Sequence, residues 1–380
     1  MVKVKGLLVY VLLASAFGCG SSYSSPLGEG NGTRGGGAAG GSGPTTGSGG
    51  TTGSSHPGKP PLGGGPSAAG SGMAGAAGTG AGGTGGGSAC TGDPLTRCAG
   101  TTSGPWCTET LAAGSLPFFD GLWANRPDDV WFVGGQFPPG GDTTAFGMIA
   151  RFDGCTWTVT QRPDLPLLSG VWGAAPNDVW IVGAGGSAYH WNGTDLAAVP
   201  VPGATSLSSV SGSSSTDVWA VGTAIFHWNG SAWAQSFANV GIDVWAVAPN
   251  DVWVASGSTD ALHFDGRAWT GTPLTDFGLF SIWGDGTQAY AAGEGEALFR
   301  FSGGSWTTLQ GRGGSSQGFV DIGGLGADIF TVGNSQVVRL AGATFTPVAD
   351  APAQSFTRVW VSPTQVWLGA PDGVVSHRTR

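Results

Sequence analysis

The stretch "PNDVWIVG", from Pro176 to Gly183, returns as "PNDVWVAS" from Pro249 to Ser256. A Pro-Asn pair is typical of a tight turn, and the β-branched and aromatic residues after it are typical of a strand. Exact or altered copies of the Asp-Val-Trp core recur at a spacing of mostly 34 to 40 residues, which indicates a repeat architecture. The seven copies are Asp129-Val130-Trp131, Asp178-Val179-Trp180, Asp217-Val218-Trp219, Asp251-Val252-Trp253, Gln288-Ala289-Tyr290, Asp328-Ile329-Phe330 and Gln365-Val366-Trp367.

A second strand is predicted ahead of each copy. Seven or eight residues upstream lies an aromatic or small residue, always preceded by an aliphatic one. We name this strand A and the Asp-Val-Trp strand B. The aliphatic positions are Leu122, Val171, Val210, Val244, Ile282, Ile322 and Val359.

Two more strands complete the repeat. Strand C ends in sequences such as "HWNG", from His190 to Gly193, and Asn-Gly or Asp-Gly is a hairpin signal because both turn positions favour positive φ. We expect Trp219 and Trp228 to face each other across the B–C hairpin. An aromatic residue three positions after the glycine opens strand D, at Trp157, Trp233, Trp269, Trp306 and Phe345.

The repeat predicts the fold class. A four-stranded antiparallel unit of this size cannot bury both of its faces alone, so neighbouring units must cover them. Seven such units arranged radially form an all-β, seven-bladed β-propeller, which we place at residues 105–380. The last unit supplies only three strands, whereas "SGPWCTET" (Ser103 to Thr110) carries Trp106 in the strand-D register. We expect this N-terminal strand to complete the last blade and remove its exposed edge.

These repeats resemble known propeller repeats. Asp-Val-Trp followed by Asn-Gly or Asp-Gly and a further Trp is similar to the tandem repeats of propeller-bearing bacterial secreted lipoproteins. It is more distantly similar to WD40, kelch and sialidase-type blades. The resemblance covers roughly residues 103–380 and implies the architecture only, because propellers host binding proteins, scaffolds and unrelated enzymes.

The N-terminal quarter has the composition of a leader and a tether. Two lysines precede a short apolar run, which predicts a signal peptide at residues 1–18. The residues up to Cys19 resemble the bacterial lipobox, which implies lipidation of Cys19. Residues 19–88 are mostly Gly, Ser, Thr, Ala and Pro, so we expect a disordered tether, followed by a cysteine-containing lead-in at 89–104. These features predict a lipid-anchored location in the cell envelope, at the outer membrane or cell surface, with a secreted or periplasmic location as the alternative.

Four cysteines remain after Cys19, and an oxidising compartment favours disulfides. Three pairings are possible. Cys107 lies in the closing strand and Cys155 in the C–D turn of the first blade, so we expect these two to bridge the seam of the ring. Cys90 would then pair with Cys98.

Charge restricts the partners. The chain has a formal net charge of −9, only 10% charged residues and no basic run after the leader. We therefore expect no nucleic-acid partner, and membrane contact only through the lipid anchor. The sequence offers no cofactor motif, and we expect a monomer without a cofactor.

Most residues that suggest chemistry occupy a repeat position. Four histidines end strand C in different blades, so we predict no metal site, because metal ligands must converge. The tryptophans fall in strand positions, which predicts packing between blades. The resemblance to a sialidase Asp-box at "FDGCTW" is one residue short, and Glu294 and Glu296 lie in a predicted hairpin.

One register on strand A stands out. Two residues before the Trp position, the predicted channel-lining residues are Gly121, Gly170, Ser209, Asp243, Ser281, Asp321 and Arg358. The charged members Asp243, Asp321 and Arg358 are a candidate polar site at the channel mouth, and the alternative is solvated charges that hold water in the channel. We expect a non-catalytic platform that binds a protein or polysaccharide. The alternative is a glycan-active glycosidase or lyase that uses these acids.

Overall fold

A computed structural model describes residues 98, 100–111, 116–137, 145–313, 318–333, 335–341 and 344–380. The predicted signal peptide, Cys19, the tether and Cys90 lie outside these residues. No helix in the described part is long and apolar enough to cross a membrane.

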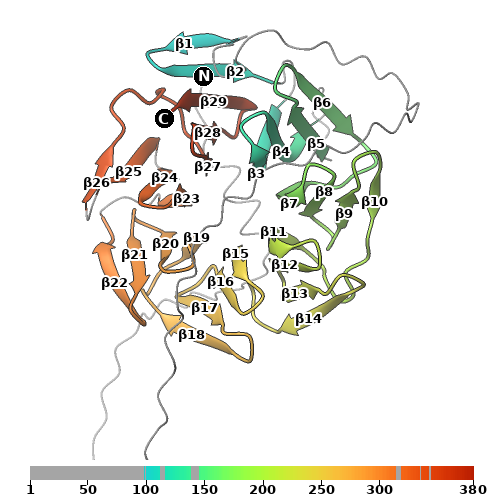
Figure 1. Cartoon of the computed structure of the whole chain (residues 1–380), viewed down its shortest axis with the longest axis vertical. Coiled ribbons are helices and arrows are strands. Elements are labelled where there is room, and N and C mark those ends of the chain that lie inside the picture. The colour runs from blue at the N-terminus through green and yellow to red at the C-terminus, as the bar shows by residue number, and fades with distance from the viewer. Residues whose placement is uncertain are drawn as a thin grey trace, which may run out of the picture. The chain divides into compact units, whose positions relative to one another are not determined.

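The described residues of the propeller form strands and no helix, and seven antiparallel sheets stand around a common centre, as Figure 1 shows. The all-β, seven-bladed prediction is confirmed. Blades one to six each take their four strands from one repeat, with strand A innermost and strand D at the rim, whereas blade seven takes three strands from its repeat and the others from the N-terminal segment. Blade one contains β3 (Leu116–Arg126), β4 (Asp129–Phe137), β5 (Phe146–Phe152) and β6 (Trp157–Arg162). Blade two contains β7 (Leu168–Ala175), β8 (Asp178–Gly183), β9 (Ala188–Trp191) and β10 (Leu196–Ala198). Blade three contains β11 (Leu207–Ser214), β12 (Asp217–Gly222), β13 (Ile225–Trp228) and β14 (Trp233–Phe237).

The second half of the ring repeats the same order of strands. Blade four contains β15 (Asp243–Ala248), β16 (Asp251–Ala255), β17 (Asp260–Phe264) and β18 (Trp269–Pro273). Blade five contains β19 (Leu279–Gly284), β20 (Ala289–Gly293), β21 (Leu298–Ser302) and β22 (Ser305–Gln310). Blade six contains β23 (Phe319–Leu325), β24 (Asp328–Gly333), β25 (Gln336–Ala341) and β26 (Thr344–Pro347). Blade seven contains β27 (Arg358–Val361), β28 (Gln365–Gly369) and β29 (Val374–Thr379).

An N-terminal strand closes the ring, as predicted. β2 (Trp106–Thr110) pairs antiparallel with β29, and the register runs from Trp106 opposite Arg378 to Thr110 opposite Val374. Trp106 is fully buried, in the same core cluster as Phe330 of blade six. This strand therefore supplies both the missing fourth strand and a core side chain of blade seven.

The closing strand has a neighbour that was not predicted. β1 (Thr101–Ser103) turns back along β2 as a fifth strand, with Thr102 opposite Cys107. This hairpin brings Cys98 to Cys107, and the two form a disulfide with a Cα–Cα distance of 5.5 Å. The predicted pairs of Cys107 with Cys155 and of Cys90 with Cys98 are wrong, because the chain turns back between β1 and β2 and brings Cys98 to Cys107. Cys155 is also disulfide-bonded.

Tryptophans pack between blades, as predicted. The strand-B ring of one blade meets the strand-D ring of the next, nearly edge-on, at 5.3 Å for Trp180 and Trp233 and at 5.6 Å for Trp253 and Trp306. Edge-to-face pairs of this kind stabilise beyond the area they bury. Trp219 meets Trp269 in the same way. The repeated tryptophans therefore hold neighbouring blades together.

The expected pair of Trp219 and Trp228 is wrong by one residue. Trp219 lies opposite His227, whereas Trp228 points to the other face of the sheet and contacts Trp180 of blade two at 5.0 Å. Successive residues of a strand point to opposite faces, so a shift of one residue changes the partner.

The C–D turns also differ from the prediction. Only their glycines have positive φ, for example 99° at Gly193, and the preceding Asn or Asp does not. Asn192 instead accepts hydrogen bonds through its side chain from the backbone N–H groups of Thr194 and Asp195, at 2.9 and 2.8 Å. Asp153 in "FDGCTW" does the same with Cys155 and Thr156. The turn is thus a four-residue loop held by its Asn or Asp side chain.

Candidate functional site

The Asp of Asp-Val-Trp holds together two side chains of its own blade. In blade three, Asp217 Oδ1 accepts hydrogen bonds from the Trp219 indole at 3.2 Å and from His227 Nε2 at 2.7 Å. The imidazole of His227 stacks on Trp219 with ring centroids 4.2 Å apart. Analogous Asp–His pairs join His190 with Asp178 and His263 with Asp251. Blade three therefore contains a structural triad of Asp, Trp and His, the other two blades share its Asp–His pair, and the three histidines serve separate blades.

Blade seven departs from this pattern. Gln365 replaces the Asp and accepts the Trp367 N–H at 2.8 Å, so His377 instead lies 3.9 Å from Glu109 of the closing strand. Ligand atoms of Cys107, Glu109 and His377 lie within 4.8 Å of one another. Metals bind the thiolate form of cysteine, and the Cys107 sulfur is bonded to Cys98. In the disulfide state this cluster offers two ligands.

The channel-lining residues of strand A contact one another from blade to blade, and we call this ring of residues the inner belt. Asp243 of blade four accepts the backbone N–H of Ile282 in blade five at 3.0 Å. Asp321 of blade six accepts the backbone N–H of Val359 in blade seven at 2.8 Å. The candidate acids thus make backbone contacts with the next blade.

Two serines and the arginine extend the belt. Ser209 Oγ donates to Asp243 at 2.8 Å, and Ser281 Oγ lies between the two acids, 2.8 Å from Asp243 and 3.0 Å from Asp321. Arg358 donates through Nε to the carbonyl oxygen of Asp120 in blade one. The serines belong to the predicted register, and the sequence signal for their role is their position between the charged residues.

Glycines continue the belt where side chains do not fit. A Cβ at Gly121 would lie 3.1 Å from Gly170 Cα, and one at Gly170 would lie 3.0 Å from Ser209 Cα. In blades one to three the inner backbones therefore approach each other directly. The expected crowding at the axis is present.

Burial strongly affects the ionisation of Asp321. Burial raises the pKa of Asp321 to about 7, although the nearby Arg358 charge lowers it, and the Asp243 charge raises it further. Burial also raises the pKa of Asp120, again against the effect of Arg358. A carboxyl with a pKa near neutrality is also found at catalytic sites, so the hydrogen bonds must decide its role.

Glu294 and Glu296 lie in the hairpin between β20 and β21, as the sequence predicts. Glu294 forms an ion pair with Arg312 at 2.5 Å, and the Arg312 guanidinium lies over the Phe277 ring. Glu296 occupies a turn with φ of 64°.

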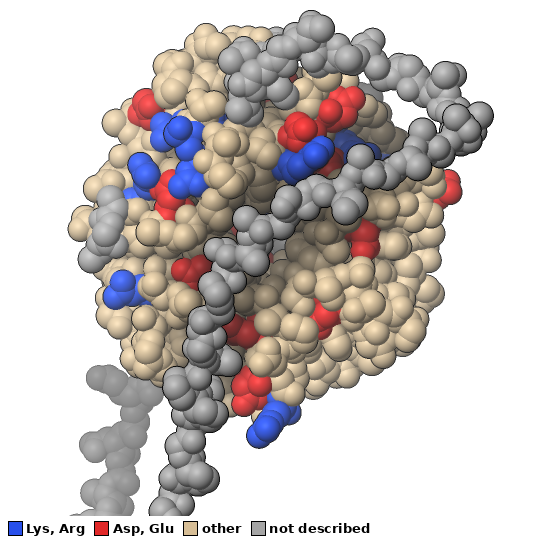
Figure 2. Space-filling view, viewed as in Figure 1, with Lys and Arg blue, Asp and Glu red and all other residues tan. Residues whose placement is uncertain are grey.

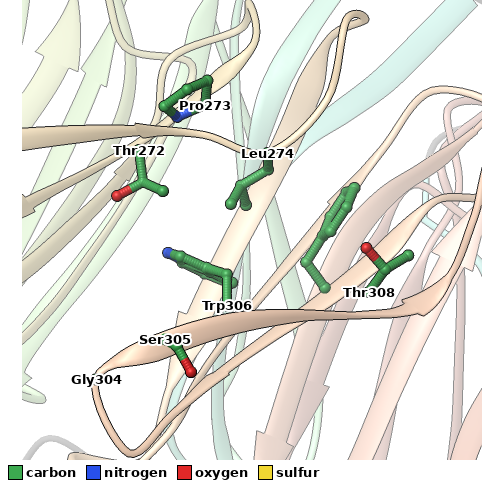
Figure 3. Close-up of a pocket in the computed structure, with 8 residues that line it drawn as sticks. Thr272, Pro273, Leu274, Gly304, Ser305, Trp306 and Thr308 are labelled. Carbon is green, nitrogen blue, oxygen red and sulfur yellow. The ribbon is translucent and has the colours of Figure 1, made fainter.

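A groove on the rim was not anticipated from the sequence. It lies between β18 and β22, has a volume of about 430 Å³, and is lined by residues without charge (Figure 3). Trp306 points into it toward Leu274 and Thr272, and Ser305 and Thr308 line the β22 side. Its lining therefore combines an aromatic ring with hydroxyl groups.

The neighbouring seam explains why this groove is open. Between blades three and four, Phe237 stacks on Trp269 at 5.9 Å, and Ser236 accepts the Trp269 N–H. Phe237 lies opposite Ile225, and the equivalent residue of blade four, opposite Ala261, is Thr272. A small side chain thus replaces the aromatic ring that fills the other seam. This replacement is the sequence signal for the groove.

The visible face of the ring is mostly uncharged. Figure 2 shows acidic and basic side chains in small separate groups among uncharged residues. The exposed surface therefore offers little attraction to a strongly charged polymer on this face.

Comparisons with known proteins agree on the fold. No family model matches the chain, and no curated protein matches it. Among solved structures it is similar to YCF48 bound to a D1 peptide, with 16% identity and a TM-score of 0.57 over 75% of this chain and all of the other. It is also similar to virginiamycin B lyase from Staphylococcus aureus, with 12% identity and a TM-score of 0.60 over 72% of this chain and 99% of the other.

A third similar structure is the WD40 propeller domain of Doa1, at 15% identity and a TM-score of 0.56, covering 71% of this chain and 96% of that one. At these identities the likeness shows the β-propeller fold alone. The three proteins have different functions by name, so the fold leaves open whether this chain binds or catalyses.

Proposed function

We propose that this protein is a tethered lipoprotein of the cell envelope whose propeller binds a protein or polysaccharide without acting on it chemically. The main support is the bonding of the channel acids. Asp243 and Asp321 accept backbone N–H groups of the next blade, so their oxygen atoms are already used within the ring. A residue committed in this way is a poor nucleophile or general base.

The rim groove is the binding surface in this proposal. Its uncharged lining of a tryptophan face and hydroxyl groups fits an uncharged partner surface. Exposed aromatic faces contribute strongly to recognition, and hydroxyl groups fix orientation. The composition of the propeller, poor in charge, supports the same class of partner.

The lipid anchor belongs to the proposal as well. A cysteine directly followed by a long Gly-rich segment supports a lipidated stalk that holds the propeller away from a membrane. Mass spectrometry of the mature N-terminus tests this part, with a diacylglyceryl-modified Cys19 expected and an unmodified or differently cleaved N-terminus contradicting it.

A glycan-active enzyme is the second candidate. The favouring observation is that burial raises the pKa of Asp321 to about 7, because a glycosidase needs a carboxylic acid that is still protonated near neutral pH. Turnover, rather than binding, distinguishes this candidate.

Binding can be tested at the groove. Thr272→Phe places an aromatic ring where Phe237 fills the equivalent seam, so it should reduce retention on purified envelope polysaccharides or proteins by about tenfold or more, which is about 1.4 kcal/mol. Thr307→Phe is the matched control, because Thr307 follows Trp306 on the same strand and points to the opposite face. Equal retention of both variants and the wild type would exclude the groove.

A further inference from the structure

The hydrogen bonds of the inner belt specify where its protons lie. Asp243 receives four hydrogen bonds: Oδ1 from Ser209 Oγ and Val244 N, and Oδ2 from Ser281 Oγ and Ile282 N. An ionised carboxylate only accepts hydrogen bonds, with about four lone-pair positions. Asp243 is therefore fully satisfied as an anion.

Ser281 has one hydrogen and three neighbours. Its Oγ lies 2.8 Å from Asp243 Oδ2, 3.0 Å from Asp321 Oδ1 and 3.2 Å from Ile322 N. The hydroxyl donates its single hydrogen to Asp243, its shorter contact, and the backbone N–H of Ile322 is shared between Ser281 Oγ at 3.2 Å and Asp321 Oδ1 at 3.0 Å. The contact with Asp321 is then a hydrogen bond only if Asp321 supplies the hydrogen, because two acceptors at 3.0 Å repel each other.

We infer that Asp321 is protonated in the native ring and donates its proton to Ser281, so that a single proton completes the chain Asp321–Ser281–Asp243–Ser209 across blades six to three. The remaining oxygen, Oδ2, accepts the backbone N–H of Val359, which extends the chain to blade seven. In this arrangement both oxygens of Asp321 have partners, because Oδ1 also accepts the shared N–H of Ile322. This inference is independent of any ligand.

Burial and the Asp243 charge favour a neutral Asp321, and the Arg358 charge opposes it. The charged residue of β27, Arg358, directs its hydrogen bonds to the carbonyl oxygens of Asp120 and Thr357 and makes none to Asp321 among the described contacts. The charged residue of β15, Asp243, disfavours a second anion. Thr331 of β24 donates to the Asp321 backbone oxygen and does not titrate. Burial is the largest influence, and it raises the pKa of Asp321 to about 7.

The proton makes the inner belt sensitive to pH. Because the pKa of Asp321 in the folded ring is above its ordinary value of 3.8, the folded state binds more protons than the unfolded state between about pH 4 and 7. The contribution of Asp321 to stability is therefore greatest at acidic pH. It falls as the pH rises through this window and levels off above the folded pKa.

Infrared difference spectroscopy tests this assignment directly. The carbonyl band of a protonated carboxylic acid should be present at pH 6, half lost near pH 7 and absent at pH 9 in the wild type. The part of this band that titrates near pH 7 should be missing in Asp321→Asn. Asp120, whose pKa is also raised, is the competing source, so Asp120→Asn must retain a band that titrates near pH 7.

Thermal unfolding provides the second readout. The asparagine amide can donate to Ser281 as the protonated acid does, so Asp321→Asn should fold. It should also lose the fall in melting temperature between pH 5 and 8 that the wild type shows. Ser209→Ala keeps the proton and should retain that fall. A band unchanged in Asp321→Asn, or an unchanged pH dependence of its melting temperature, would overturn the inference.

Discussion

Oδ1 of Asp217 lies 2.7 Å from Nε2 of His227 and also accepts the indole N–H of Trp219. One carboxylate thus joins strands B and C of a blade. The same Asp–His pair recurs in blades two and four, which explains why the Asp of strand B and the His of strand C are repeated together there.

Asp217→Asn should lower the free energy of unfolding by about 1–2 kcal/mol, because one buried acceptor and the negative charge are lost. Urea denaturation at pH 7 measures this loss. Asp276→Asn, at an exposed position, is the control and should stay within about 0.5 kcal/mol of the wild type.

The loss caused by Asp217→Asn should depend on pH. Burial raises the pKa of Asp217, but hydrogen bonds from His227 and Ser213 outweigh this, and the net pKa is below its ordinary value of 3.8. The charged form therefore stabilises the fold above that value, and its contribution is lost as the pH falls through the lower folded pKa. The difference between variant and wild type should shrink below about pH 4, and a constant difference would contradict this explanation.

Trp106 should be among the costliest side chains to remove. Trp106→Ala leaves a cavity in the blade that closes the ring, so we expect a loss of about 3–5 kcal/mol in urea denaturation. The buried Trp106 indole N–H has no hydrogen-bond partner in the described part of the chain, so Trp106→Phe should cost clearly less. Similar losses for both variants would show that the ring does not depend on the volume of this side chain.

The disulfide between Cys98 and Cys107 should add to the closure without being essential for it. The cysteines are nine residues apart, and the chain-entropy model then gives about 2–3 kcal/mol. The double variant Cys98→Ser/Cys107→Ser should lose that amount of unfolding free energy, measured by urea denaturation. It should keep its β-sheet circular dichroism. Loss of the folded spectrum would contradict a closure that rests mainly on the pairing of β2 with β29.

Gly212 should not tolerate a side chain. A Cβ there would lie 2.7 Å from the Trp172 ring of blade two and 2.7 Å from the backbone oxygen of Asp217. Gly212→Ala should therefore cost about 1–3 kcal/mol through overpacking. Gly311→Ala has open space and serves as the control for the same substitution in a thermal melt.

The repeat predicted the blades because each copy carries the same alternation of buried and exposed residues. It also predicted the closing strand, since Trp106 occupies the strand-D register. The disulfide could not be predicted in the same way. The turn before β2 occurs only once in the chain, so no second copy shows which cysteines it brings together.

The candidate site was predicted by position but not by role. The register singled out Asp243, Asp321 and Arg358, yet a sequence does not show that their partners are backbone groups of the next blade. The triad left a clearer signal, because Asp217 and His227 recur as a pair in other blades. The groove depends on the difference between Phe237 and Thr272, which is visible only after strand registers are known.

The most direct test of binding without catalysis is to incubate the propeller with purified envelope polysaccharides and measure both the bound fraction and the size of the polymers afterwards. We predict that the wild type retains a polymer or envelope protein and leaves it intact, and that Asp243→Asn and Asp321→Asn release no fragments either. Fragments released by the wild type and abolished in Asp321→Asn would contradict the account, because Asp321 would then be a catalytic acid rather than a part of the belt.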